Sequence, residues 1–181
     1  MLILAGGEGS RMGGGKPHRL LGGQTLLARA IERAQSWSDC VAIAVRSAEQ
    51  VEETGVRIFL DPPGLEGPLG GLASGLRLER PTVITIPCDS PFLPDNLVDR
   101  LTSALPGHGA ALPASGGRLH PVCGLWRADV LAEVRAYAAS GRRSLIGFAE
   151  TIGYARVEWP EGAFFNVNTA EHLAEAEARL S

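Results

Sequence analysis

The chain has 181 residues, of which 45% are hydrophobic and 20% charged, and its formal net charge is −3. This length and composition predict one globular domain over residues 1–181, and neither a basic block for nucleic acid nor an apolar run of membrane-spanning length is present. The three cysteines, Cys40, Cys88 and Cys123, form no C-x-x-C pair, and the start lacks the features of a signal peptide. We therefore expect a cytoplasmic protein, and the scattered histidines predict no zinc site.

The first predicted strand, residues 2–4, leads into a loop rich in glycine that includes Gly6 and Gly7. Glycines allow successive backbone N–H groups to converge on an anion, and Arg11 and Lys16 would add positive charge. In an open α/β sheet, the carboxyl end of a strand is where the ligand binds. The alternative is a flexible glycine-rich terminus, which the adjacent strand and the two cations argue against.

This loop matches neither of two common nucleotide motifs. The sequence G-x-G-x-x-G requires a final glycine where Met12 stands, and the P-loop requires glycine where Ser10 stands and Ser or Thr where Pro17 stands. What remains is L-A-G-G-x-x-x-R-M-G followed by Lys16. That arrangement resembles the signature of nucleotidyltransferases, which transfer a nucleoside monophosphate from a nucleoside triphosphate.

The rest of the chain alternates predicted strands and helices. The further predicted strands are residues 41–45, 56–60, 82–86, 110–113, 119–126, 154–159 and 163–168. The first predicted helix is capped by Thr25, and its buried face consists of Leu27, Ala30, Ile31 and Ala34. A short exposed helix is predicted at 47–54. The next helix begins within residues 67–71, and its buried face consists of Leu69, Leu72, Ala73 and Leu76. One further helix is predicted to start at Asp95. Others are predicted at 128–139, at 144–150 and after Asn168. This alternation predicts an α/β fold with a mainly parallel sheet flanked by helices.

Asp89 directly follows the strongly β-branched strand 82–86. A carboxylate at the carboxyl end of a buried central strand faces the ligand crevice, and Mg²⁺ is typically held by one or two carboxylates together with substrate phosphates. Asp89 is therefore predicted to bind Mg²⁺. The alternative is an aspartate that bonds its own backbone in a turn.

Three other positions have a structural and a functional interpretation. The glycines of residues 67–71 would bring a helix end close to a phosphate or a base, or would only permit close packing of the helix on the sheet. Asn168 fits the N-cap of the last helix with Glu171 three residues later, which leaves Asn166 as the freer candidate for ligand contact. His120 is expected to be a hydrogen-bonded residue at the rim and not a catalyst.

Four segments together resemble the molybdenum cofactor guanylyltransferases, the MobA-type enzymes. They are L-A-G-G-E-G-S-R-M-G-G-G-K-P at 4–17, G-P-L-G-G-L at 67–72, P-C-D-S-P-F-L-P at 87–94 and F-N-V-N-T-A-E-H-L at 165–173. The resemblance implies a three-layer Rossmann-like nucleotidyltransferase fold. It also implies transfer of GMP from GTP to molybdopterin with release of pyrophosphate.

The resemblance also implies roles for individual residues. The positions matching the GTP contacts are Leu4, Ala5, Gly6, Gly7, Lys16, Asp61 and Asp89. Asp89 matches the Mg²⁺ ligand and is grouped with Arg11 and Lys16 as catalytic, because the reaction needs charge stabilisation more than acid–base chemistry. Asn166 and Asn168 match the stretch near the pterin. GTP and molybdopterin are the expected partners, with transient contact to other cofactor-biosynthesis proteins or acceptor molybdoenzymes.

One position departs from the family pattern. The second strand of the family can carry an asparagine that contacts the nucleotide, and this chain has Ala44 at the aligned position. A cytidylyltransferase acting on the same pterin is therefore the alternative enzyme. A non-catalytic nucleotide-binding module is the alternative of another class, although such a module could lack Lys16 or Asp89, both of which are present.

Overall fold

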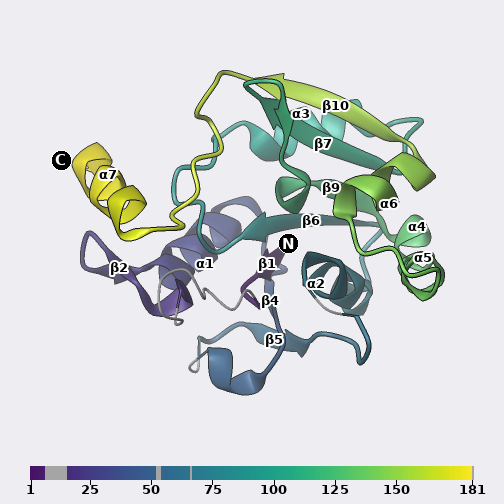
Figure 1. The fold of residues 1–181 in the computed structure, drawn as a ribbon, viewed down its shortest axis with the longest axis horizontal. Helices are drawn as coiled ribbons and strands as arrows, with labels where there is room; N and C mark the ends of the chain where they lie inside the picture. The colour runs from purple at the N-terminus through teal and green to yellow at the C-terminus, as the bar shows by residue number, and fades with distance from the viewer. Residues whose placement is uncertain (7–15, 52–53, 66, 181) are drawn as a thin grey trace.

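The computed structural model describes residues 1–6, 16–51, 54–65 and 67–180, Lys16 by its backbone alone. An eight-stranded sheet runs in the order β10-β7-β9-β6-β1-β4-β5, and β8 pairs with β7 beside this path (Figure 1). Its strands are β1 (Leu2–Leu4), β4 (Ala42–Val45), β5 (Arg57–Leu60), β6 (Thr82–Pro87), β7 (Ala110–Ser115), β8 (Arg118–Leu119), β9 (Leu125–Arg127) and β10 (Tyr154–Trp159). A separate antiparallel pair is formed by β2 (Leu20–Leu21) and β3 (Gln24–Thr25).

The expected parallel sheet is confirmed around β1, which pairs in parallel with β4 on one side and with β6 on the other. In this register Leu4 lies opposite both Ala44 and Pro87. Strand β9 is antiparallel to both β6 and β7, and β10 runs parallel to β7 at the edge. Strands β1, β4, β5 and β6 therefore all end at the same edge of the sheet.

Helices cover both faces of the sheet and make the three layers. They are α1 (Leu26–Trp37), α2 (Pro68–Ser74), α3 (Leu97–Ala104), α4 (Ala128–Leu131), α5 (Val134–Ala139), α6 (Leu145–Ile152) and α7 (Ala170–Leu180). The described residues also include the 3-10 turns η2 (Lys16–His18), η3 (Ala48–Gln50), η4 (Gly75–Leu78) and η5 (Pro121–Cys123). In Figure 1, α2 and α4–α6 lie to the right of the sheet, whereas α7 stands apart on the left beside the β2 hairpin.

The two faces of the sheet have separate cores because side chains alternate along a strand. Ile3 of β1 packs in the cluster that holds the buried faces of α1 and α3, whereas the preceding Leu2 packs in the cluster of α2, α5 and α6. A third, smaller cluster contains Leu21, Leu26, Val167 and Ala176 and attaches α7 to the β2–β3 hairpin.

The expected start and buried face of α1 are confirmed. The Thr25 hydroxyl accepts a hydrogen bond from the Ala28 N–H at 3.1 Å, and Leu27, Ala30, Ile31 and Ala34 are buried. The stripe predicted for α2 is wrong at its last position, because the helix tightens into η4 after Ser74. That change of pitch leaves Leu76 39% exposed and turns Leu78 inward.

Several predicted boundaries were wrong. The helix predicted at 47–54 is the single turn η3 among the residues described there, and the helix predicted from Asp95 begins at Leu97. The helix predicted at 128–139 is two helices, α4 and α5. The strand predicted at 119–126 is divided into β8, η5 and β9, because Pro121 has no N–H for a sheet hydrogen bond.

The segment 163–168 forms no strand, contrary to prediction. The cap of α7 was also predicted wrongly, since the hydroxyl of Thr169, and not the Asn168 side chain, accepts the His172 N–H at 3.2 Å. None of Cys40, Cys88 and Cys123 is part of a disulfide. Among the residues described, none of the helices combines the length and apolar character needed to cross a bilayer.

Candidate active site

A cavity of about 210 Å³ lies at the edge where β1, β4, β5 and β6 end. Its lining residues are Leu4, Gly6, Ala44, Asp61, Gly67, Pro68, Gly71, Pro87, Asp89, Val122 and Asn166. Five of the residues predicted for the site, Leu4, Gly6, Asp61, Asp89 and Asn166, therefore meet in one cavity although they come from four separate stretches of the chain.

Backbone hydrogen bonds between adjacent strand ends hold these residues in place. The Ala5 N–H donates to the Ala44 carbonyl oxygen at 3.0 Å, and the Cys88 N–H donates to that of Leu4 at 3.3 Å. The Asp61 N–H donates to the Val45 carbonyl oxygen at 2.8 Å. The sheet thus continues its pairing one residue past β1, β5 and β6, and the next side chains reach the cavity.

Ala5 differs from its neighbours in the site. Its side chain is buried, its N–H is taken by the sheet, and it does not line the cavity. Gly7 and Arg11 lie outside the described residues, and the side chain of Lys16 is likewise undescribed. The roles of these four residues stay predictions.

The Asp61 carboxyl is half-buried in the cavity wall. Burial raises its pKa to about 6, and the positive charge of Arg46 opposes that rise. Its Oδ1 is shielded from solvent and has no hydrogen-bond partner among the described residues. Within the described part of the site, this carboxylate oxygen has lost its hydration without gaining a hydrogen-bond donor, as expected where a ligand supplies the missing donor.

Small residues make room for this carboxyl. A Cβ at Gly6 or at Gly70 would stand 3.4 Å from Asp61 Oδ2. At Gly70 it would also stand only 2.2 Å from the carbonyl oxygen of Leu65, so that glycine serves close packing of α2. Gly67 and Gly71 line the cavity. Close packing is therefore confirmed at Gly70, whereas the approach of this helix end to a phosphate or a base stays a prediction.

The segment before α7 approaches the cavity without joining the sheet. The Val167 N–H donates to the carbonyl oxygen of Asp89 at 2.8 Å, and Asn166 lines the cavity. Asn168 is not part of the lining, and its N–H donates to Nδ1 of His172 at 3.2 Å. Of the two asparagines, Asn166 is thus the one that lines the cavity.

Sequence reasoning missed several of the lining residues. Val122 comes from η5, a turn that no periodic pattern indicates, and Pro87 and Pro68 lie next to predicted site residues. His120 is held at the rim: its Nε2 lies 3.0 Å from the Ser115 hydroxyl, and its ring stacks on Phe164 with centroids 4.7 Å apart. This arrangement agrees with its exclusion from the catalytic residues.

The donor set of the cavity suits a hard cation. Among the described residues that line it, the charged groups are the carboxylates of Asp61 and Asp89, and neither histidine nor cysteine is present. Within the described ranges there is no cluster of three or more His, Cys, Asp or Glu side chains that would form a complete metal cage. Such a site fits Mg²⁺, which keeps several waters and binds through one or two carboxylates and substrate phosphates.

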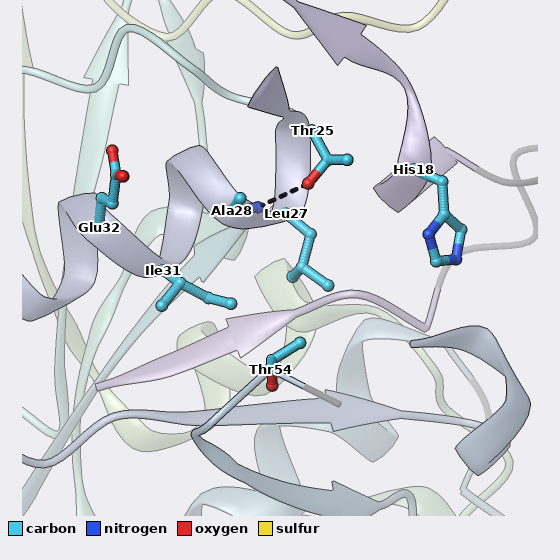
Figure 2. A pocket seen from close by; sticks show the side chains of 7 residues that line it. All are labelled: His18, Thr25, Leu27, Ala28, Ile31, Glu32 and Thr54. Carbon is cyan, nitrogen blue, oxygen red and sulfur yellow. Dashed lines mark hydrogen bonds between the residues drawn. The ribbon is translucent and has the colours of Figure 1, made fainter. Parts of the chain in front are cut away.

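A second cavity, of about 310 Å³, lies between α1 and the segment around Thr54 (Figure 2). Leu27, Ala28 and Ile31 of α1 supply an apolar wall, and the Thr25 hydroxyl that lines it is already used as the helix cap. His18 stands at its margin with Nε2 3.1 Å from the carbonyl oxygen of Gln50. None of the residues predicted for the site lines this cavity.

Comparison with known proteins places this geometry in a family. The family model described as the MobA-like NTP transferase domain matches residues 1–153. A molybdenum cofactor guanylyltransferase from Cereibacter sphaeroides is 40% identical over 99% of this chain and 95% of its own length. One from Bradyrhizobium is 41% identical over 97% of this chain and 90% of its own length.

Solved structures show the same fold at lower identity. Molybdopterin-guanine dinucleotide biosynthesis protein A from Archaeoglobus fulgidus superposes with a TM-score of 0.82 at 21% identity, covering 99% of this chain and 97% of that one. The 2-C-methyl-D-erythritol 4-phosphate cytidylyltransferase from Thermus thermophilus gives a TM-score of 0.75 at 18% identity, covering 99% and 98%. The fold is therefore shared by enzymes that use different bases.

Proposed function

This chain belongs to the family of MobA-like NTP transferases, and on that premise we propose that it transfers GMP from GTP to molybdopterin and releases pyrophosphate. The observation that carries the proposal is the cavity at the carboxyl edge of the sheet, where Asp61, Asp89, Gly6 and Asn166 converge. Relatives about 40% identical over nearly the whole chain are named molybdenum cofactor guanylyltransferases. The substrates of this enzyme are then GTP and molybdopterin, and its expected location is the cytoplasm.

Asp61 is the residue that we assign to binding the guanine base of GTP. Its Oδ1 is buried and receives no hydrogen bond from the residues that the structure describes. Guanine carries a ring N–H and an exocyclic amine on one edge, so it can donate two parallel hydrogen bonds to a carboxylate, whereas cytosine offers its single exocyclic amine. Ala44 contributes only a methyl group to the lining, so the base contact passes to Asp61. This argument favours GTP over CTP.

The reaction requires positioning of two anions more than acid–base catalysis. A terminal phosphate oxygen of the acceptor forms a bond to the α-phosphorus of GTP, and the bond from that phosphorus to the β-phosphate oxygen breaks with its electron pair leaving on pyrophosphate. The attacking oxygen is already anionic at neutral pH, so no general base is needed. Lys16 and Arg11 are assigned to neutralise the triphosphate.

Asp89 is assigned to hold Mg²⁺. The ion, when bound, neutralises charge on the phosphate oxygens as pyrophosphate leaves. The protein's part is to fix the carboxylate at the end of β6, which it does through the bond from Cys88 N–H to Leu4 and the bond from Val167 N–H to Asp89. Transient contact with other cofactor-biosynthesis proteins or acceptor molybdoenzymes would deliver and remove the pterin.

The test is pyrophosphate release by the purified protein with molybdopterin and GTP, CTP or ATP in parallel, each with and without Mg²⁺. We expect release with GTP and Mg²⁺, and a preference for GTP over CTP that is reduced in the Asp61→Asn variant. Equal or faster turnover with CTP would replace the guanylyl assignment by the cytidylyl one. Tight GTP binding without any release would indicate a nucleotide-binding module.

A further inference from the structure

Two hydrogen bonds join the loop after β6 to the segment before α7, directly beside the cavity. The first is the backbone bond from Val167 N–H to the Asp89 carbonyl oxygen, 2.8 Å long. The second runs between side chains: the Ser90 hydroxyl donates to Oδ1 of Asn166 at 2.6 Å. Ser90 is buried, 6% exposed, and is not among the residues lining the cavity, whereas Asn166 is.

The direction of the side-chain bond decides what Asn166 offers to a ligand. An asparagine amide carries an oxygen that only accepts hydrogen bonds and a nitrogen that donates two. Because Oδ1 faces the Ser90 hydroxyl and accepts its hydrogen bond, the amide is held with its oxygen toward Ser90, and its two N–H groups are the donors left for a ligand. A phosphate oxygen needs a donor, and an amide turned the other way would present it with a partly negative oxygen.

We propose that Ser90 is a positioning residue for the acceptor substrate. Its hydroxyl holds the Asn166 amide with the nitrogen available to the cavity, where it donates to the terminal phosphate of the acceptor. The proposal rests on the proposed function, since it takes the attacking phosphate to be that of molybdopterin. Because Ser90 follows Asp89 directly, a single short loop then places both the metal carboxylate and the acceptor's hydrogen-bond donor.

A purely structural Ser90 would behave differently. A hydroxyl that only contributed to packing would, when removed, lower the stability of the whole edge and affect both substrates alike. A hydroxyl that orients Asn166 affects the acceptor selectively, because Gly6 and Asp61, which are assigned to GTP, lie on other segments. Asp89 is the neighbour of Ser90, but the backbone bonds from Cys88 N–H to Leu4 and from Val167 N–H to Asp89 hold it without the Ser90 hydroxyl. The ratio of the two KM values separates these roles.

The first experiment compares Ser90→Ala, Ser90→Thr and the parent. For Ser90→Ala we expect KM for molybdopterin to rise about tenfold and KM for GTP to change less than about twofold, as for loss of one oriented hydrogen bond. Ser90→Thr keeps the hydroxyl and should restore KM for molybdopterin. The matched control is Ser115→Ala, at a similarly buried serine, 7% exposed, whose hydroxyl bonds His120 instead.

The second experiment tests whether Ser90 acts through Asn166. In an Asn166→Ala background, Ser90→Ala should change KM for molybdopterin by less than about twofold, since nothing remains to be oriented. Independent effects that multiply would overturn the proposal. So would equal increases in both KM values, or a failure of Ser90→Thr to restore acceptor binding when that variant is folded.

Equilibrium binding of molybdopterin, measured without turnover, separates this inference from the proposed function. A parent protein that transfers GMP, with Ser90→Ala indistinguishable from it, contradicts the inference alone. A parent that binds molybdopterin through Ser90 and Asn166 but releases no pyrophosphate contradicts the function alone. A parent that neither binds molybdopterin nor transfers GMP contradicts both.

Discussion

Gly71 of α2 lies directly against Leu4 of β1, so that a Cβ at Gly71 would come within 2.8 Å of Leu4 Cδ2. Both residues line the cavity at the carboxyl edge of the sheet. The position of the helix over the strand end is therefore set by the absence of a side chain at Gly71. The width of the cavity depends on the same contact.

The first prediction compares two neighbouring glycines. Gly70→Ala should destabilise the fold by about 3 kcal/mol, because its Cβ would meet the Leu65 backbone carbonyl at 2.2 Å. Gly71→Ala should cost only about 1 kcal/mol, because the Leu4 side chain can move. Denaturant unfolding measures both. The gain in helix propensity on replacing glycine by alanine, about 1 kcal/mol, is common to the two variants and does not affect their comparison. Equal losses of stability in the two variants would show that α2 shifts as a unit.

The second prediction concerns Asp61 and pH. Its pKa in the folded protein is about 6, raised by burial from 3.8. Between these pH values the folded state keeps a proton that the unfolded state has released, so stability falls as pH rises and the loss is complete above pH 6. Asp61→Asn should therefore stabilise the nucleotide-free protein at pH 8 by about 1 kcal/mol, a figure reduced for partial contact with water.

At pH 3.5 the same substitution should change stability much less, because the carboxyl is then protonated in the folded state and mostly protonated in the unfolded state. Thermal unfolding of the parent and Asp61→Asn at the two pH values is the measurement. A stabilisation of equal size at both pH values would assign the effect to hydrogen bonding instead of charge.

The third prediction concerns Asp89. Asp89→Asn keeps the shape of the side chain but removes its charge. Transfer should fall at least about a hundredfold with much weaker dependence on Mg²⁺, since the ion acts on charge that develops as pyrophosphate leaves. GTP binding, measured separately, should fall far less. A rate of pyrophosphate release within threefold of the parent's, with unchanged Mg²⁺ dependence, would show that Asp89 is not the metal ligand.

The fourth prediction compares the reactivity of the Cys40 and Cys123 thiols. Burial alone would raise the pKa of Cys40, but a hydrogen bond from Arg80 and the charges of the amino terminus, Arg57 and Arg80 outweigh it and lower the pKa. Burial, and then the negative charge of Asp89, raise the pKa of Cys123. Iodoacetamide at neutral pH should therefore alkylate Cys40 first, about tenfold faster or more. Peptide mass analysis over time would show the order, and Cys123 reacting first would contradict it.

Much of the site could be predicted because a parallel sheet collects strand ends at one edge. Gly6, Asp61 and Asp89 each follow a short apolar strand, and that local pattern is enough to bring them together. The contribution of Val122 could not be found in this way, because η5 arises where Pro121 interrupts pairing within an otherwise apolar run.

The segment 163–168 shows where the prediction of secondary structure from local sequence fails. Its alternation of apolar and polar residues is typical of a strand, yet Phe164 reaches the core by packing on His120 and on Trp159, without a partner strand. The bond between Ser90 and Asn166 joins residues 76 positions apart. Nothing in either local sequence indicates such a pairing, since it depends on how two loops meet in space.

The central place of β1 has a consequence for the order in which the chain can fold. Leu2 pairs with Ala42 and with Thr85, which are 40 and 83 positions further along the chain. Because β1 is synthesised before both of its partner strands, it must wait for them, and contacts of such long sequence separation are slow to form. During synthesis β1 can pair with β4 first, but its other edge stays unpaired until β6 has emerged. A newly made chain therefore depends on protection from aggregation at this stage.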